Sequence, residues 1–236
     1  MKYSYLECLS LYGVGGAHPG GLSLTKQLLL KENVAKDTAI LDVGCGTGLT
    51  SAYLAKQFRC HVTAMDNNRV MLEKARRRFR QTRLPITLVY GTTEKLPFED
   101  KSFDLLLSES VTIFTHVTAS LGEYKRVLKP KGIFLGIEMV VDPNCPSEVR
   151  KEIADFYGIS KLLSVSEWQA YFKKAGFREV SILNVETSKH VDQFEANDFI
   201  PSKDIDPRCA KVIEKHEELT EKYFGSISYR VFRCVA

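Results

Sequence analysis

The sequence lacks the cysteine and histidine clusters that hold zinc, because its six cysteines are scattered singly and form no CxxC pair. The opening MKYSYLECLS has no basic stretch followed by an apolar one, and no apolar run approaches the length that crosses a bilayer. Repeats and low-complexity tracts are also absent. We therefore expect no bound metal, no membrane partner and a cytoplasmic chain with reduced thiols.

A strong charge of either sign is also missing. The 33 basic and 29 acidic residues leave a formal charge of +4, and most of the excess lies in the run KARRRFRQTR at 74–83. A nucleic-acid-binding surface and a solvated helix face both carry such runs, and we favour the solvated face. We expect no nucleic-acid partner, and a monomer or a homodimer.

From residue 39 onward, short apolar segments alternate with segments of helical periodicity, which predicts a parallel sheet with helices on both faces. We expect strands at 39–43, 60–66, 86–91, 102–111, 132–141, 180–187 and 227–235. We expect helices at 49–58, 70–80, 117–128, 146–158, 166–177 and 211–224. The predicted fold class is α/β, a Rossmann-like three-layer sandwich whose seven-stranded sheet is mostly parallel, with an antiparallel last strand.

Two helix ends carry specific signals. The segment Lys129-Pro130-Lys131-Gly132 is expected to stop the helix at 117–128, and the next strand to begin at Gly132. The helix at 166–177 is expected to be capped by Ser166 and closed by Gly176. In such a sheet the loops after residues 43, 66, 91, 108 and 138 converge on one ligand site.

The stretch LDVGCGTG at 41–48 is a glycine-rich turn between a strand and a helix. A dinucleotide fingerprint, G-x-G-x-x-G, would place its third glycine where this chain has Leu49. Asp66 ends the next strand, where a carboxylate can accept hydrogen bonds from both ribose hydroxyls. The pattern predicts an adenosine ribose without a pyrophosphate, bound beside an amino-acid-like tail.

Four blocks in this order resemble the class I S-adenosylmethionine-dependent methyltransferases: D-x-G-x-G-x-G at 42–48, Asp66, GTTEKLPFEDKSFD at 91–104 and RVLKPKGIF at 126–134. They are most similar to the branch with the quinone-biosynthesis C-methyltransferases and many small-molecule methyltransferases. The resemblance covers roughly residues 38–187. It implies S-adenosylmethionine as cofactor, S-adenosylhomocysteine as product and a small-molecule methyl acceptor.

The resemblance also implies a set of cofactor contacts. The glycine turn would cradle the methionine part, Asp42 would hold the turn and help to receive the ammonium group, and Asp66 would bind the ribose hydroxyls. Relatives often carry an aspartate where this chain has Thr92, so a hydroxyl or the Thr93 backbone is expected to replace that adenine contact. The full set is Tyr12, Asp42, Gly44, Cys45, Gly46, Thr47, Gly48, Asp66, Asn67, Thr92, Thr93, Glu94, Ser108 and Glu109.

The domain organisation follows from the same comparison. We expect a single domain over 1–236, with a cofactor-binding core at 39–141 completed by 166–187 and 225–236. Residues 1–38 would form an N-terminal cap or lid, and the insertions at 142–165 and 188–224 would shape the acceptor side. The HPGG turn at 18–21 has two interpretations: with Tyr12 it closes the site, or it only begins a helix at 22–30.

Methyl transfer from a sulfonium is one in-line displacement, so positioning supplies most of the rate and a base is needed only for a protonated nucleophile. The candidate catalytic residues are Glu109 and His18, and Glu109 could instead only contact the cofactor. Glu138 could pair with a basic residue, a structural role that we favour, or border the acceptor pocket. His116 is expected to cap a helix or lie on the surface.

Two alternatives to a methyltransferase of small molecules stay open. The first is a non-catalytic module that binds S-adenosylmethionine or S-adenosylhomocysteine as a sensor or assembly partner. The second is a nicotinamide oxidoreductase, which Leu49 disfavours. The Asn/Asp-Pro-Pro-Tyr/Phe motif for methylating base nitrogens is missing, because SESV stands at 108–111.

Overall fold

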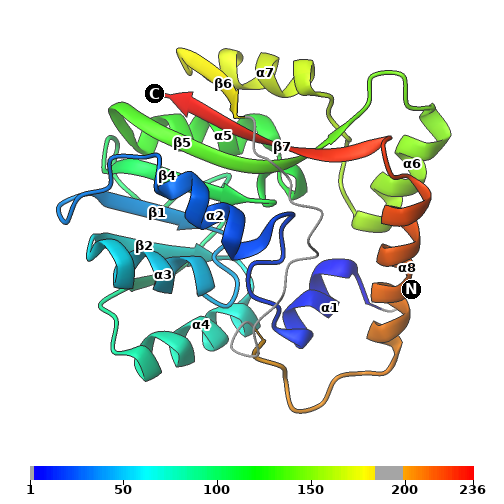
Figure 1. Ribbon diagram of the computed structural model, residues 1–236, viewed down its shortest axis with the longest axis horizontal. Coiled ribbons are helices and arrows are strands. Elements are labelled where there is room, and N and C mark those ends of the chain that lie inside the picture. Colours follow the sequence, from blue (N-terminus) through cyan, green and yellow to red (C-terminus); the bar gives the residue numbers. More distant parts are fainter. Residues whose placement is uncertain (1–2, 184–198) are drawn as a thin grey trace.

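A computed structural model describes residues 3–183 and 199–236 of the chain as an α/β sandwich (Figure 1). Its seven-stranded sheet has the order β3-β2-β1-β4-β5-β7-β6. Only the pairings that β7 makes are antiparallel, which confirms the predicted fold class. The strands are β1 Ala39–Val43, β2 His61–Asp66, β3 Thr87–Tyr90, β4 Phe103–Glu109, β5 Leu128–Val141, β6 Glu179–Leu183 and β7 Ile227–Val235.

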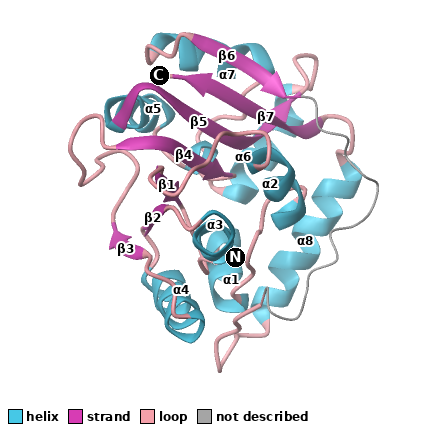
Figure 2. Cartoon of the chain, turned by 60° about the vertical axis from the view of Figure 1, so that its left-hand side comes forward, coloured by secondary structure: helices cyan, strands magenta, loops and turns pink. Residues whose placement is uncertain are grey.

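Eight α-helices and one short 3-10 helix surround the sheet in the described residues. They are α1 Tyr5–Tyr12, α2 Gly21–Leu29, α3 Leu49–Phe58, α4 Arg69–Thr82, η1 Thr112–Phe114, α5 Val117–Val127, α6 Ser147–Tyr157, α7 Val165–Lys174 and α8 Arg208–Lys222. Helices α2, α3 and α4 cover one face of the sheet, and α5 and α7 cover the other (Figure 2). Within the described part of the chain no helix combines the length and apolarity needed to cross a bilayer.

Side chains of the central strands alternate between the two faces, as a pleated strand requires. Along β1, Ile40 packs with α2 and α3, whereas Leu41 and Val43 join the core under α5 and α7. The same alternation along β4 sends Leu105 and Leu107 to the first face and Leu106 to the second. Both faces are therefore dry, and the site forms beyond the ends of the strands.

Two of the predicted boundary signals, at Gly132 and Ser166, are wrong. Strand β5 begins at Leu128, directly after α5, because Leu128 already pairs with Phe103 before a register shift across the Pro130 segment. The predicted cap Ser166 is wrong: Ser164 caps α7, since its hydroxyl accepts from the backbone of Glu167 and that carboxylate accepts from Ser164 in return. Residues 184–187 of the predicted strand and 188–198 of the second insertion lie outside the described residues.

Helix α1 was not predicted, although a capping box between Ser4 and Glu7 marks its start. It contacts α4, α6 and α8, and in both views it lies next to α8 (Figures 1 and 2). The ammonium group of Lys74 on α4 donates to the carbonyls of Ser10 and Leu11, at 2.6 and 2.9 Å. Residues 3–18 thus fold back over the carboxyl ends of the strands.

The run at 74–83 is not only the solvated face that we expected. Lys74 and Arg78 are buried, at 7% and 9% exposure. Arg78 donates 2.9 Å from Nε to the carbonyl of Thr47, inside the glycine turn. Two cations of the basic run therefore hold the N-terminal segment and the glycine turn in place, a role that helical periodicity alone could not indicate.

Candidate active site

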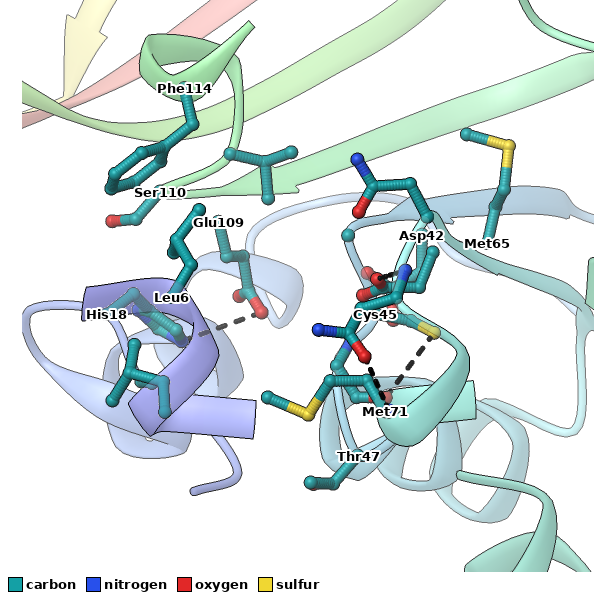
Figure 3. A pocket seen from close by; sticks show the side chains of 18 of the residues that line it. Leu6, His18, Asp42, Cys45, Thr47, Met65, Met71, Glu109, Ser110 and Phe114 are labelled. Carbon is teal, nitrogen blue, oxygen red and sulfur yellow. Dashed lines mark hydrogen bonds and ion pairs between the residues drawn. The ribbon is translucent and has the colours of Figure 1, made fainter. Parts of the chain in front are cut away.

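A cavity of about 220 Å³ lies beyond the carboxyl ends of β1, β2 and β4. The strand order reverses between β1 and β4, which is where open α/β sheets bind their ligands. One wall is the glycine turn after β1, and the facing wall comes from α1 and the segment that follows it (Figure 3). Core and N-terminal segment therefore enclose the space together.

The three glycines of the turn serve different purposes. A Cβ atom on Gly44 would lie 2.3 Å from a methyl carbon of Val111, and one on Gly48 would lie 2.5 Å from the ring of Phe79. A Cβ on Gly46 would meet no atom within 4 Å, although its φ is +52°. Gly44 and Gly48 thus permit close packing inside the protein, whereas Gly46 leaves free space at the cavity wall for a ligand.

Asp66 ties the end of β2 to the glycine turn. Its Oδ2 accepts 2.9 Å from the backbone N–H of Gly46, and its Oδ1 accepts 2.8 Å from that of Asn68. Burial raises the pKa of this carboxyl despite these hydrogen bonds. Each oxygen keeps a further lone pair, so the group can still accept from a ligand hydroxyl in the cavity.

Glu109 ends β4 and points into the cavity toward His18 (Figure 3). It accepts hydrogen bonds from the hydroxyls of Thr25 and of Thr50, the second at 2.7 Å. The Nε2 of His18 lies 3.5 Å from Oε2 of Glu109. The other ring nitrogen of His18 lies 3.2 Å from the carbonyl of Pro19, which orients the ring.

The cavity is acidic. Asp42, Asp66 and Glu109 line it, and none of its lining residues, all within the described part of the chain, is Lys or Arg. Burial and the negative charge of Glu109 raise the pKa of Asp42 to about 8. A positively charged ligand would offset this repulsion, whereas a pyrophosphate would add to it.

The structure brings most of the predicted site residues together. The cavity lining includes both candidate catalytic residues and, of the expected cofactor contacts, Asp42, Gly44, Cys45, Gly46, Thr47, Asp66, Asn67, Thr92, Thr93 and Glu109. The hydroxyl of Thr93 lies 2.8 Å from that of Ser120. The hydroxyl of Thr92, by contrast, makes no hydrogen bond to the described residues.

Four expected contacts do not line this cavity. Ser108 points to the opposite face from its neighbour Glu109 and bonds Thr112 and Glu138. The others are turned elsewhere: Gly48 packs under Phe79, Glu94 accepts from the backbone of His116, and Tyr12 packs against the cluster of Cys8, Cys209 and Val212. All four residues were predicted from their positions in the sequence. The side chains of Tyr12, Glu94 and Ser108 point away from the cavity, and Gly48 lies against Phe79.

Sequence reasoning missed several lining residues. Leu6 and Leu9 come from α1, and Phe114 and Thr115 come from the loop after β4. The capping box at Ser4 was a usable signal for α1, but the sequence holds none for where that helix docks. His18 lines the cavity and Gly20 is the N-cap of α2, so the HPGG turn does more than begin a helix, and closure of the site by this turn stays a prediction.

Glu138 has no basic partner among the described residues. It lines neither this cavity nor the second cavity described below. It is fully buried and accepts from the backbone N–H groups of Thr112 and Ile113, at 3.0 and 3.2 Å. Burial raises its pKa to about 7. Glu138 therefore fixes the loop after β4, a structural role, but through backbone N–H groups and not through the basic partner that we expected. His116 caps α5 through Nδ1, as predicted.

A second cavity of about 520 Å³ adjoins the first. The two share Leu6, Leu9, Ala17, Ser110 and Phe114 as lining residues. Beyond that shared wall the second cavity is bounded by α6, α8 and the start of β7, with apolar and aromatic side chains such as Tyr5, Met139 and Phe224. An acidic cavity thus lies next to a larger, mostly apolar one.

Fold and site together define an α/β protein with an acidic cavity at the switch point of its sheet, next to a mostly apolar cavity. Comparison with known proteins agrees. A family model described as a methyltransferase domain matches residues 40–132. An uncharacterized methyltransferase of Bacillus subtilis, YodH, is 39% identical over 97% of each chain. A sterol 24-C-methyltransferase of Neurospora crassa is 30% identical over 71% of this chain and 45% of its own length.

Solved structures show the same fold. Phosphoethanolamine N-methyltransferase 2 of Haemonchus contortus, in complex with S-adenosylmethionine, superposes with a TM-score of 0.78 at 18% identity, over all of this chain and 58% of its own. The chain therefore belongs to the class I S-adenosylmethionine-dependent methyltransferases. S-adenosylmethionine is its cofactor.

Proposed function

We propose that this methyltransferase transfers a methyl group from S-adenosylmethionine, held in the acidic cavity, to a small molecule in the apolar cavity. The observation that carries the proposal is the shared wall between these two cavities of opposite character. The sterol and phosphoethanolamine methyltransferases among the compared proteins act on small molecules by their names, which supports the same kind of acceptor.

The residues of the first cavity fit this cofactor. The space beside Gly46 admits a ligand against the backbone, and the Asp66 carboxylate is placed to accept from ribose hydroxyls. Glu109 supplies negative charge for an ammonium group and a sulfonium, and a bound cation would lower the raised pKa of Asp42 and favour its ionised form. When bound, the cofactor supplies an electrophilic methyl group. The protein contributes orientation and a matched electrostatic environment.

We infer that His18 and Glu109 are the groups available to take up a proton from the acceptor. His18 lies at the junction of the cavities, because its neighbours Ala17 and Pro19 both line the second one. The Thr25 hydroxyl lies 3.3 Å from Nε2 of His18 and donates to Glu109, which links the two groups. A nucleophile that arrives without a proton would use the pair for binding alone.

The proposal also includes an N-terminal cap and a cytoplasmic location. Residues 1–38 act as a cap over the cofactor, supported by the contacts of α1 and by His18 in the cavity wall. A cytoplasmic location is consistent with six cysteines that are all free thiols.

Calorimetric titration with S-adenosylmethionine, S-adenosylhomocysteine and NAD tests the proposal. We expect binding of the first two and none of NAD, because a pyrophosphate would meet three carboxyl groups and no cation. Absence of S-adenosylmethionine binding would refute the proposed function. Tight binding without turnover on a broad panel of small acceptors would favour the non-catalytic module instead.

A further inference from the structure

The two cavities differ in charge, and this inference, which rests on the proposed function, concerns the ligand of the second. None of the second cavity's lining residues, all of them described, is Asp, Glu or Lys. Its one permanently charged side chain is Arg230 at the exposed rim, which donates to the carbonyl of Tyr229 at 2.7 Å and to the hydroxyl of Ser228. The cavity therefore offers no anion to a cationic ligand.

Two polar side chains that contact each other line this mostly apolar cavity. The hydroxyl of Tyr157, at the end of α6, lies 2.7 Å from Nδ1 of His216 on α8. The ring of Tyr5 packs against both, edge-on to Tyr157 at 5.1 Å and tilted over His216 at 4.8 Å. Three helices thus hold the pair, which lines the second cavity but not the first.

The Tyr157–His216 pair keeps one hydrogen-bond donor for a ligand. Burial lowers the pKa of His216 and raises that of Tyr157, so a neutral ring and a protonated hydroxyl share two hydrogens. One hydrogen occupies the bond between them. If Tyr157 donates, the N–H at Nε2 of His216 is left; if His216 donates, the hydroxyl of Tyr157 is left. Either tautomer leaves one donor at the wall of the second cavity, without a partner among the described residues.

We propose that the methyl acceptor is an apolar, non-cationic molecule that carries an oxygen group, and that the Tyr157–His216 pair binds this oxygen. A ligand oxygen that enters the cavity would accept from this donor in place of water. Because the pair lies outside the first cavity, this oxygen is held away from the methyl group. An ammonium group inside this cavity is disfavoured, since none of its described lining residues is a carboxylate.

Binding of four naphthyl probes to the protein saturated with S-adenosylhomocysteine tests the inference. The probes are naphthalene, 2-naphthol, 2-naphthoate and 2-naphthylmethylammonium, followed by their own fluorescence. We expect 2-naphthol or 2-naphthoate to bind about tenfold more tightly than naphthalene, the effect of one hydrogen bond. The comparison of these two distinguishes a neutral from an anionic oxygen group. We expect the ammonium probe to bind most weakly.

Variants identify the pair as the cause. In Tyr157→Phe/His216→Leu and Tyr157→Phe/His216→Phe, which each remove both hydrogens of the pair, the oxygen preference is expected to fall to about twofold or less, with unchanged affinity for S-adenosylhomocysteine. Tyr223→Phe is the matched control, because its hydroxyl donates to Glu152 and neither residue lines the cavity. This control should keep the full preference.

Three results would overturn the inference: tightest binding of the ammonium probe, an equal loss for all four probes in both variants, or no probe binding to protein that binds S-adenosylhomocysteine. Failure of the proposed function is read separately, from the calorimetric titration with the cofactor.

Discussion

The imidazole of His18 lies 3.5 Å from the carboxylate of Glu109, which joins the N-terminal segment to the end of the fourth strand inside the cavity wall. Thr25 of α2 donates to the same carboxylate. This contact makes the binding site a product of both parts of the chain. Changes on either side of it should alter cofactor binding.

Replacing Glu109 by Gln should weaken S-adenosylmethionine binding by about ten- to a hundredfold, because an amide keeps the shape of the side chain but loses its charge. Parallel titration with S-adenosylhomocysteine locates the contact. Equal losses place Glu109 at the ammonium group, and a larger loss for S-adenosylmethionine places it at the sulfonium. Glu73→Gln on the exposed side of α4 is the control. Unchanged affinity in Glu109→Gln would contradict the assigned role.

Asp66→Asn should abolish discrimination between ribose and deoxyribose. The wild type is expected to bind S-adenosylhomocysteine at least about tenfold more tightly than its 2′-deoxy analogue, because the carboxylate accepts from the hydroxyl. The amide also opposes its NH₂ to a backbone N–H of Gly46 or Asn68, so the variant should lose about 1–3 kcal/mol of stability. The affinity ratio, measured below the melting transition, separates the two effects. A variant that still prefers the ribose would exclude Asp66 as its partner.

Alanine at two glycines of the turn should have different consequences. Both Gly44 and Gly46 have positive φ, so each substitution costs about 1–2 kcal/mol in the backbone. Gly44→Ala adds an overlap with Val111 and should be less stable by about a further 1–3 kcal/mol. Gly46→Ala fills free space, so its main effect should be lost cofactor affinity. Denaturant titration and calorimetry check both, and equal stability of the two variants would contradict the packing argument.

Glu138 should make stability depend on pH. The folded state raises its pKa from 4.5 to about 7, so the native protein binds more protons than the unfolded chain between these values. Stability from this group is full below about pH 4.5 and falls by about 3 kcal/mol as pH rises through 7. Glu138→Gln lacks this titration and loses an acceptor for a backbone N–H. The free-energy advantage of the wild type over the variant should therefore shrink with rising pH, and a constant difference would contradict the prediction.

Deleting the residues before Ser23 should reduce cofactor affinity and turnover, because Leu6, Leu9 and His18 are removed from the cavity wall. The milder variant Lys74→Met keeps these residues but removes the two hydrogen bonds to the end of α1. It should lower affinity less than the deletion. Full binding and turnover in the shortened chain would overturn the cap.

Much of the architecture follows from local patterns. The apolar strand at 39–43, the amphipathic helix at 49–58 and the glycine turn between them were predicted with the bounds that the structure has. Ser166 does not cap α7, because Ser164 forms the capping box instead. Gly132 does not begin β5, because Leu128 already pairs with Phe103. Such contacts depend on neighbours in space.

The sequence by itself determined the layered α/β fold and the type of methyl donor, because periodicity and the blocks around Gly46 and Asp66 are local properties of the chain. Only the tertiary structure decided which side chains face the ligand. It turns Ser108 away while Glu109 points in, and it brings Tyr157 on one insertion to His216 on another. Docking of α1, α6 and α8 depends on burial and shape between distant segments, so the acceptor side of the site exists only in the folded chain.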